Sequence, residues 1–343
     1  MPESSLIILI VIVILAIGFG VSNGFNDAAN AIATVIGTRS LSPRNAIAMA
    51  AVMNLAGAVM GTAVAVTIGK GILTQEVITE FSYVPVIAAL ASVIIWAVVA
   101  TYMGLPVSIS HGFVAGLAAA GIALAGPEAV LWGWSYKLTT TLLAVVTAPA
   151  LGFISGFALM VILSWLFWRS APDRIRVIFS RSQWISSAFV AYSHGKNDGQ
   201  MPIGVITMAL VIYTGQADLW EQLPYGSLWW VVILSAASIS MGTAFGGWRV
   251  IKTMGTKITT LRPIHGFAAQ ASAAAVIELA SHFGIPVSTT HCTTATIMGV
   301  GSTRRFSAVR WGIAGNIIAA WIFTFPICGG LGYLFAWLLK LIT

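Results

Sequence analysis

The sequence Ser-Asn-Gly-Phe-Asn-Asp at residues 22–27 places a carboxylate inside a run of apolar residues, and a close copy, Ser-His-Gly-Lys-Asn-Asp, occupies residues 193–198. A second pair of motifs follows the same order. Pro-Val-Ser-Ile-Ser-His at residues 106–111 returns as Pro-Val-Ser-Thr-Thr-His at residues 286–291. The copies of the first motif are 171 residues apart and those of the second are 180 residues apart. Two different motifs that repeat in order at nearly equal distances predict an internal duplication.

The composition is that of a membrane protein. The chain has 343 residues, of which 58% are hydrophobic and 8% are charged, whereas soluble proteins average about 25% charged residues. Apolar runs of about 20 residues, the length that crosses a bilayer, recur from Leu6 to Leu341. We therefore expect an all-α polytopic membrane protein.

The net charge of +7 does not indicate nucleic-acid binding, because the basic residues lie at the ends of apolar runs. The cytoplasmic loops of membrane proteins carry basic residues in these places. Cys292 and Cys328 lie inside apolar segments and match no metal-ligand spacing. We interpret both cysteines as small buried hydrophobic residues.

The loop charges of the first half predict its topology. Arg39 and Arg44 follow a span at 6–36, which places the N-terminus outside, and a second span at 46–68 returns there. Residues 84–124 are apolar but are interrupted at Gly104-Leu105-Pro106, where proline ends a helix. We expect a re-entrant hairpin there. A span at 138–168 completes a first repeat, residues 1–168.

A basic cytoplasmic linker at 169–183 separates this repeat from a second, residues 184–343. In the second repeat, a broken segment at about 263–301 begins and ends beside basic residues, so it enters from the cytoplasmic side, and a last span at 311–339 places the C-terminus outside. The two hairpins therefore enter from opposite sides. This is an inverted-topology repeat, typical of secondary transporters with sites near the midplane.

Asp27 and Asp198 are candidate functional residues, since a carboxylate at the bilayer centre costs at least about 2.5–3.5 kcal/mol. Each follows an asparagine, Asn26 or Asn197, whose amide can donate and accept. The alternative is a polar contact that only joins two helices.

A helix that opens at each Pro-Val-Ser break points free amide groups into the break and forms an anion site. Nearby hydroxyl groups can donate to the same anion; they belong to Ser108, Ser110, Ser288, Thr289 and Thr290. The alternative for these residues is helix N-capping.

Three further side chains are candidates for substrate contact or support of the site: His111, His291 and Gln200. For the two histidines the alternative is a buried neutral ring that orients the break. Lys196 is expected either to reach outward or to pair with Asp198.

An anion would not bind beside two bare carboxylates, so a cation must neutralise them. The residues therefore predict anion transport coupled to Na⁺ or H⁺, with no other cofactor. Hydrogen phosphate carries a proton and could also donate a hydrogen bond to a carboxylate, whereas sulfate could not.

The motifs at residues 24–31, 193–200 and 286–291 resemble the signatures of the PiT family of inorganic phosphate transporters, and the resemblance covers nearly the whole chain. It implies a Na⁺- or H⁺-coupled phosphate symporter that exchanges sides by an elevator-like or rocking motion. It implies that the Asn-Asp motifs and hairpin tips hold phosphate and the coupling ion. For the ion, with Na⁺ expected at the two aspartates, the matching residues are Asp27, Asn30, Asp198, Ser108 and Ser288.

The chain departs from the family pattern at Met201, where many members have asparagine, and at Gln270, where members often have glutamate. Ile109 also replaces a hydroxyl residue in the first hairpin. Loss of the carboxylate at Gln270 leaves the number and identity of the coupled ions open.

The alternatives are a sulfate permease on the same scaffold and, in another class, an intramembrane aspartyl protease, in which two aspartates share a proton. The Tyr-Asp and Gly-x-Gly-Asp motifs of such proteases do not surround Asp27 or Asp198. A hydrolase built on Ser108 and His111 would need a Gly-x-Ser-x-Gly pattern, which is absent at both breaks.

We expect a multi-pass protein of the bacterial plasma (inner) membrane, with phosphate and lipid as partners, a homodimer as one option, and no enzymatic activity.

Overall fold

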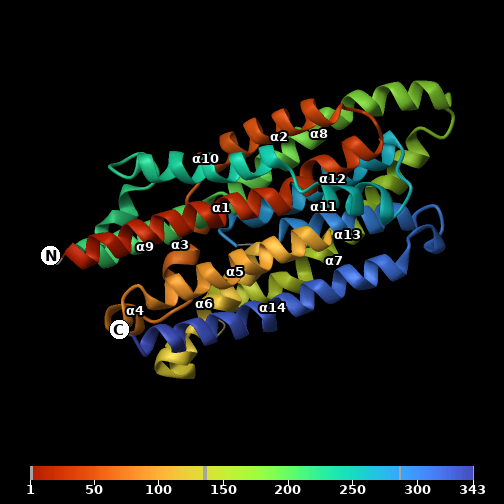
Figure 1. Cartoon of the computed structure of the whole chain (residues 1–343). Helices are drawn as coiled ribbons and strands as arrows, with labels where there is room; N and C mark the ends of the chain where they lie inside the picture. Colours follow the sequence, from red (N-terminus) through yellow and green to blue (C-terminus); the bar gives the residue numbers. More distant parts are fainter. Residues whose placement is uncertain (1–2, 134–136, 286, 343) are drawn as a thin grey trace.

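The computed structural model describes residues 3–133, 137–285 and 287–342, and Pro286 of the second hairpin motif lies outside them. Within these residues the chain is helical, and its one β-bridge pairs Leu73 with Val130. Long helices run side by side, and both termini lie at the same end of the molecule (Figure 1). The predicted all-α membrane fold is confirmed.

The described residues of the first half form seven α-helices and one 3₁₀ turn: α1 (Glu3–Gly37), α2 (Pro43–Ala58), α3 (Ala63–Lys70), α4 (Gln75–Phe81), α5 (Val84–Met103), α6 (Ile109–Ala125), η1 (Pro127–Ala129) and α7 (Lys137–Leu166). The second half has the following elements: α8 (Pro172–Asp198), α9 (Gln200–Thr214), η2 (Ala217–Gln222), α10 (Trp229–Phe245), α11 (Trp248–Lys252), the π-helical turn η3 (Thr253–Lys257), α12 (Pro263–His282), α13 (Thr289–Ser302), η4 (Phe306–Ala308) and α14 (Trp311–Lys340).

In the described parts of the chain, four helices are long and apolar enough to cross a bilayer: α1, α5, α7 and α14. Two further spans are bent pairs: α2 and α3 meet at 70°, and α10 meets the segment Trp248–Lys257 at 62°. The span predicted at 46–68 is thus not one continuous helix but is divided between α2 and α3. Glycines provide the physical reason, since Gly61 lies in the first break and Gly246, with φ of 65°, lies in the second.

Both broken hairpins have the predicted form. The helix α5 ends at Gly104, whose φ of 73° only glycine adopts readily, and α6 opens at Ile109. In the second hairpin α12 ends before Phe283 and α13 opens at Thr289. Each hairpin therefore presents a helix N-terminus at its break.

The residues expected to link the repeats, 169–183, are largely helical. Helix α8 begins at Pro172, a residue that suits the first helical position because its φ is already helical and it lacks an amide hydrogen that the helix would leave unpaired. Arginine is a good helix former, so the basic residues after Pro172 extend the helix rather than interrupt it. The basic residues of this segment therefore belong to a helix and not to a loop.

The two halves interlock. Helix α1 packs along α10, and the corresponding pair formed by the other copies of these helices is α8 with α2. Likewise, the first hairpin (α5 and α6) packs on α14, whereas the second hairpin (α12 and α13) packs on α7. Each hairpin is thus held by the last helix of the other repeat, which gives the two inverted repeats a shared core.

Glycines of the Asn-Asp motifs let these helices touch backbone to backbone. A Cβ atom added to Gly24 would lie 2.0 Å from the carbonyl oxygen of Ile239, and one added to Gly195 would lie 2.1 Å from that of Asn54. The facing helices contribute glycines that are equally close to α1 and α8: Gly242 and Gly57. Small residues at helix crossings are the usual means of close association in membranes.

We predict that Gly24→Ala and Gly195→Ala destabilise the fold by about 1–3 kcal/mol or more, because a methyl group would push two backbones apart. The measurement is thermal unfolding of the purified protein in detergent. Gly312→Ala is the matched control, since a Cβ atom there meets nothing within 4 Å. Equal melting temperatures for Gly24→Ala and Gly312→Ala would contradict the prediction.

Candidate functional site

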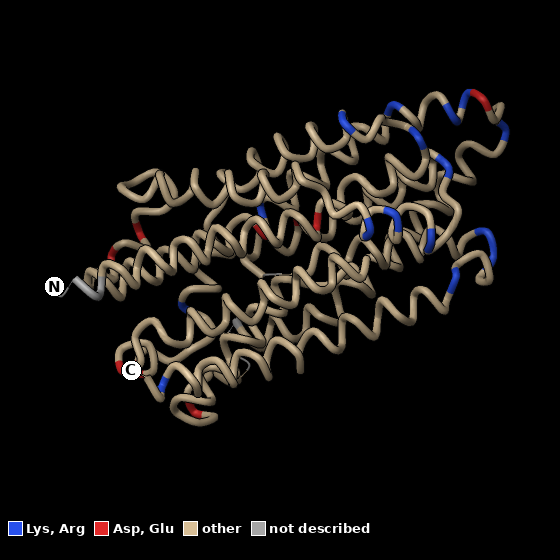
Figure 2. Tube along the Cα trace, viewed as in Figure 1, with Lys and Arg blue, Asp and Glu red and all other residues tan. Residues whose placement is uncertain are grey.

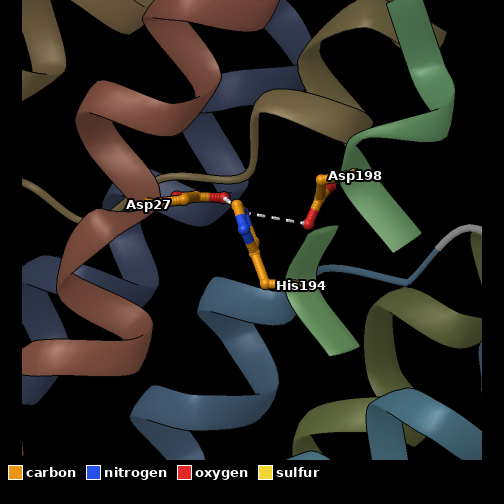
Figure 3. Close-up of side chains that lie close together, drawn as sticks. All are labelled: Asp27, His194 and Asp198. Atoms are coloured by element: carbon orange, nitrogen blue, oxygen red, sulfur yellow. Dashed lines mark ion pairs between the residues drawn. The ribbon is translucent and has the colours of Figure 1, made fainter. Parts of the chain in front are cut away.

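The two motif aspartates meet in the interior of the bundle with a histidine between them (Figure 3). Asp27 lies within α1 and Asp198 is the last residue of α8. The Nε2 atom of His194 lies 3.5 Å from Oδ2 of Asp27 and 3.4 Å from Oδ2 of Asp198. No more than 3% of any of these three side chains is exposed.

Hydroxyl groups from both hairpins donate to the two carboxylates. From the first hairpin, Ser110 Oγ donates to Asp198 Oδ1 at 2.6 Å. From the second, Thr289 Oγ1 donates to Asp198 Oδ2 at 2.9 Å, and Thr290 Oγ1 donates to Asp27 Oδ1 at 2.7 Å. The acids therefore join the two hairpins to α1 and α8.

Asn30 fixes the direction of the bonds from the second hairpin. Its Nδ2 atom donates to the hydroxyl oxygens of Thr289 and Thr290 at 3.1 and 3.0 Å. A hydroxyl group has one hydrogen to donate, and these two oxygens already accept from Asn30. Their hydrogens are thus directed to the carboxylates.

Asn26 and Asn197 brace the hairpin breaks. Asn26 accepts from the amide of Val107 and donates to the carbonyl of Leu105, both at 3.3 Å. Asn197 donates to the carbonyl of Val287 at 2.8 Å. Both asparagines, which the sequence indicated as ligands, are occupied in positioning the irregular backbone of each break.

Ser108 and Ser288 are N-caps, accepting from the amides of His111 at 3.2 Å and His291 at 3.0 Å. The two histidine rings meet edge to face with centroids 5.1 Å apart, and His291 stacks on Trp321. Within the described residues, the ring nitrogens of both histidines have no hydrogen-bond partner. The capping interpretation thus fits the serines, while the histidines are buried and unpaired.

Two further candidates make contacts outside this cluster. Gln200 Oε1 accepts from the amide of Val64 at 2.9 Å, so the glutamine caps α3. Lys196 forms an ion pair with Glu278 of α12 rather than with Asp198, and both partners are partly exposed. The hydrogen bonds and ion pairs of the described residues therefore link neither side chain to the aspartates.

Sequence reasoning did not select His194, Asn54 or Thr243, which form a chain of polar contacts. Thr243 Oγ1 donates to the carbonyl of Ile239 at 3.0 Å, so its oxygen must accept from Asn54 Nδ2 at 2.8 Å. Asn54 therefore presents its oxygen to Nδ1 of His194, 2.8 Å away, and Nδ1 carries a hydrogen. The spacing of His194 four residues before Asp198 was the available signal, because it places both on one helix face.

This tautomer leaves Nε2 of His194 facing both carboxylates. A neutral ring would direct a lone pair at two negative groups, so the cluster needs one positive charge, either a proton or a metal cation. Three ligand atoms from Asp27, His194 and Asp198 lie within 4.8 Å of one another, close enough to hold one ion. The two carboxylates of this group also accept hydrogen bonds from hydroxyl groups of both hairpins.

Gln270, where family members often have glutamate, is fully buried and bridges two helices. Its Nε2 atom donates to the carbonyl of Ala31 at 2.7 Å, and its Oε1 atom accepts from Ser186 at 3.1 Å. An ionised glutamate could not donate to that carbonyl. Here the position serves as a neutral contact between α12, α1 and α8.

Inverted repeats whose broken hairpins meet at a buried polar centre are the architecture of many membrane transporters. Residues 23–332 match the model of the Phosphate transporter family. A probable low-affinity inorganic phosphate transporter of Rhizobium meliloti is 41% identical, with 93% of this chain and 92% of the relative covered, and one of Bacillus subtilis is 38% identical, with 98% of each covered. The chain belongs to the phosphate transporter family.

A solved structure, titled the sodium-dependent phosphate transporter, has the same fold. It is 28% identical to this chain, covers 98% of it and all of its own chain, and superposes with a TM-score of 0.87. The family resemblance seen in the motifs is therefore confirmed along the whole chain.

We predict that Thr243→Val lowers phosphate uptake by up to about tenfold, because loss of one hydrogen bond, about 0.5–1.5 kcal/mol, frees Asn54 to turn and no longer orients His194. Initial uptake rates in proteoliposomes measure this. The matched control is Thr207→Val, since Thr207 is buried and its hydroxyl has no partner in the described part of the chain. Equal rates in the two variants would refute the orienting role.

Proposed function

We propose that this protein is a cation-coupled symporter that imports inorganic phosphate by alternating access, and that Asp27 and Asp198 hold the cation. The observation that carries the proposal is the meeting of both acids with hydroxyl groups of both hairpins at one buried centre. The solved relative's title supports Na⁺ as the cation, and H⁺ is the alternative. The relatives are named as transporters, which supports a non-enzymatic function.

The hydroxyl groups provide a physical basis for coupling. Ser110, Thr289 and Thr290 each have one hydrogen, and each is given to a carboxylate. A cation on the acids would weaken these bonds and free the same hydrogens to donate to phosphate. Phosphate and the cation would then bind together. Without the cation, the carboxylates repel an anion and also hold the hydroxyl hydrogens that phosphate would need.

Several buried polar groups without partners support the binding of a phosphate ion. The oxygen of Asn30, the amide of Asn23 and the rings of His111 and His291 lack partners among the described residues. Buried groups of this kind usually have partners, so these four side chains have capacity to bind a ligand. The openings of α6 and α13 add amide groups with partial positive charge.

The charge distribution supports the orientation in the membrane. Lysines and arginines gather at the end of the molecule opposite the two termini (Figure 2). By the positive-inside rule this end is cytoplasmic, so both termini are outside. The two inverted repeats, residues 1–168 and 184–343, would then open their shared centre to either side of the plasma (inner) membrane in turn.

The decisive experiment is uptake of labelled phosphate into proteoliposomes with imposed gradients of Na⁺ or H⁺ and with sulfate as competitor. If import is coupled to a cation, one of the two gradients accelerates phosphate accumulation severalfold. If phosphate rather than sulfate is the substrate, excess sulfate leaves that accumulation unchanged. Uptake that ignores both gradients would refute symport, and equal competition by sulfate would favour a sulfate permease on this scaffold.

We predict that Asp27→Asn and Asp198→Asn each abolish gradient-driven uptake, because an amide cannot provide the negative charge that holds the cation. The measurement compares initial rates and the amount of folded protein in the membrane. Asp218→Asn, in the exposed turn η2, is the control and retains wild-type rates. Normal uptake by either motif variant would end its assignment.

We predict that Thr290→Val raises the apparent KM for phosphate by about tenfold, because a hydroxyl donor to the anion, worth about 1.5 kcal/mol, is lost. Thr290→Ser keeps the donor and serves as the control. Steady-state uptake at varied phosphate concentrations measures both. A KM shared by the valine and serine variants would show that this hydroxyl does not touch the substrate.

A further inference from the structure

A cavity of about 750 Å³ opens at the basic end of the molecule, far from the acid cluster. It lies where the end of α7 meets the starts of α8 and α12. One wall is apolar and consists of Met160, Leu163, Phe167 and Ile264. The proposed transport mechanism makes no use of this space.

The cavity lies at the depth of the membrane surface. Trp168, which also lines it, is 69% exposed, and the guanidinium of Arg169 lies 4.8 Å from the centre of its ring. Tryptophan and arginine are enriched where the bilayer core gives way to headgroups. Trp165, one turn earlier on α7, is 76% exposed.

The polar side of the cavity is positively charged. Arg176 and Arg262 line it, and Asp173 is the one acidic residue among its lining. Asp173 pairs with Arg176 at 3.4 Å, but both side chains are more than two thirds exposed, so this pair is weak. Arg176 remains available for a second anionic partner.

We propose that this cavity binds an anionic phospholipid from the leaflet at the basic end of the molecule. Its phosphate would lie between Arg176 and Arg262, and an acyl chain would cover the apolar wall. A free phosphate ion would leave that wall bare, and a zwitterionic lipid would bring its own cation against the arginines. Juxtamembrane arginines favour anionic lipids in this way.

The bound lipid would join α7 and α8 to the second hairpin, because α12, the first helix of that hairpin, begins at the cavity with Pro263. Contacts of one lipid with α7, α8 and α12 would restrain the end of the hairpin that lies farthest from the acids. Lipid binding is therefore expected to stabilise the protein as a whole.

The test compares phosphatidylglycerol with phosphatidylcholine on detergent-purified full-length protein, by native mass spectrometry and thermal unfolding. For the wild type we expect retained phosphatidylglycerol and an increased melting temperature, with little effect of phosphatidylcholine. The Arg176→Gln, Arg262→Gln double variant is expected to lose roughly tenfold in phosphatidylglycerol affinity. Ser164→Trp, an exposed position in the lining, is expected to block the acyl chain. Arg305→Gln, an exposed arginine that lines a different cavity, is the control.

Equal retention of phosphatidylglycerol by the wild type and both cavity variants would overturn the proposal. The proposal would also be overturned if inorganic phosphate alone abolished the stabilisation by phosphatidylglycerol, because that would indicate a small-anion site. Equal stabilisation by phosphatidylcholine would overturn it as well. A dimer that forms without lipid and disappears in Ser164→Trp would assign the cavity to a second copy of the chain instead.

Discussion

Two buried carboxylates that share hydroxyl donors from both hairpins are the constraint on which this structure depends. Asp27 and Asp198 have almost no contact with solvent, so their charge must be balanced by protein donors or by a bound cation. Ser110 and Thr290 reach them from opposite hairpins. The position of each hairpin is therefore linked to the charge of the acids, and the proposed coupling of an ion gradient to anion transport rests on this link.

Close helix packing holds the acids together. The crossing of α8 and α2 places Gly195 against the backbone of Asn54, and the side chain of the same asparagine orients His194. A residue that sets the helix spacing thus also sets the direction of a ring nitrogen between two carboxylates. Packing and chemistry share one contact, so a change at Gly195 would alter both.

Much of this fold could be predicted from the sequence, because hydropathy, proline breaks and loop charge are local signals. The hairpins end within about two residues of their expected bounds. The bends at Gly61 and Gly246 and the helix that follows Pro172 were missed, since an apolar run conceals a bend and basic residues suit a helix as well as a loop. At the site, the repeated aspartates were evident, whereas the bracing role of Asn26 and the relay through Asn54 and Thr243 depend on contacts between distant segments.

The ion pair of Lys196 with Glu278 makes the two repeats unequal. The corresponding positions of the first repeat carry Phe25 and Val98, neither of which is charged. The second hairpin is thus fastened to α8 by an electrostatic contact that dissolved salt can screen, whereas the described residues of the first hairpin form no ion pair with α1. Under the alternating access proposed above, hairpins that enter from opposite faces would be held unequally, and the resting molecule would favour one face over the other.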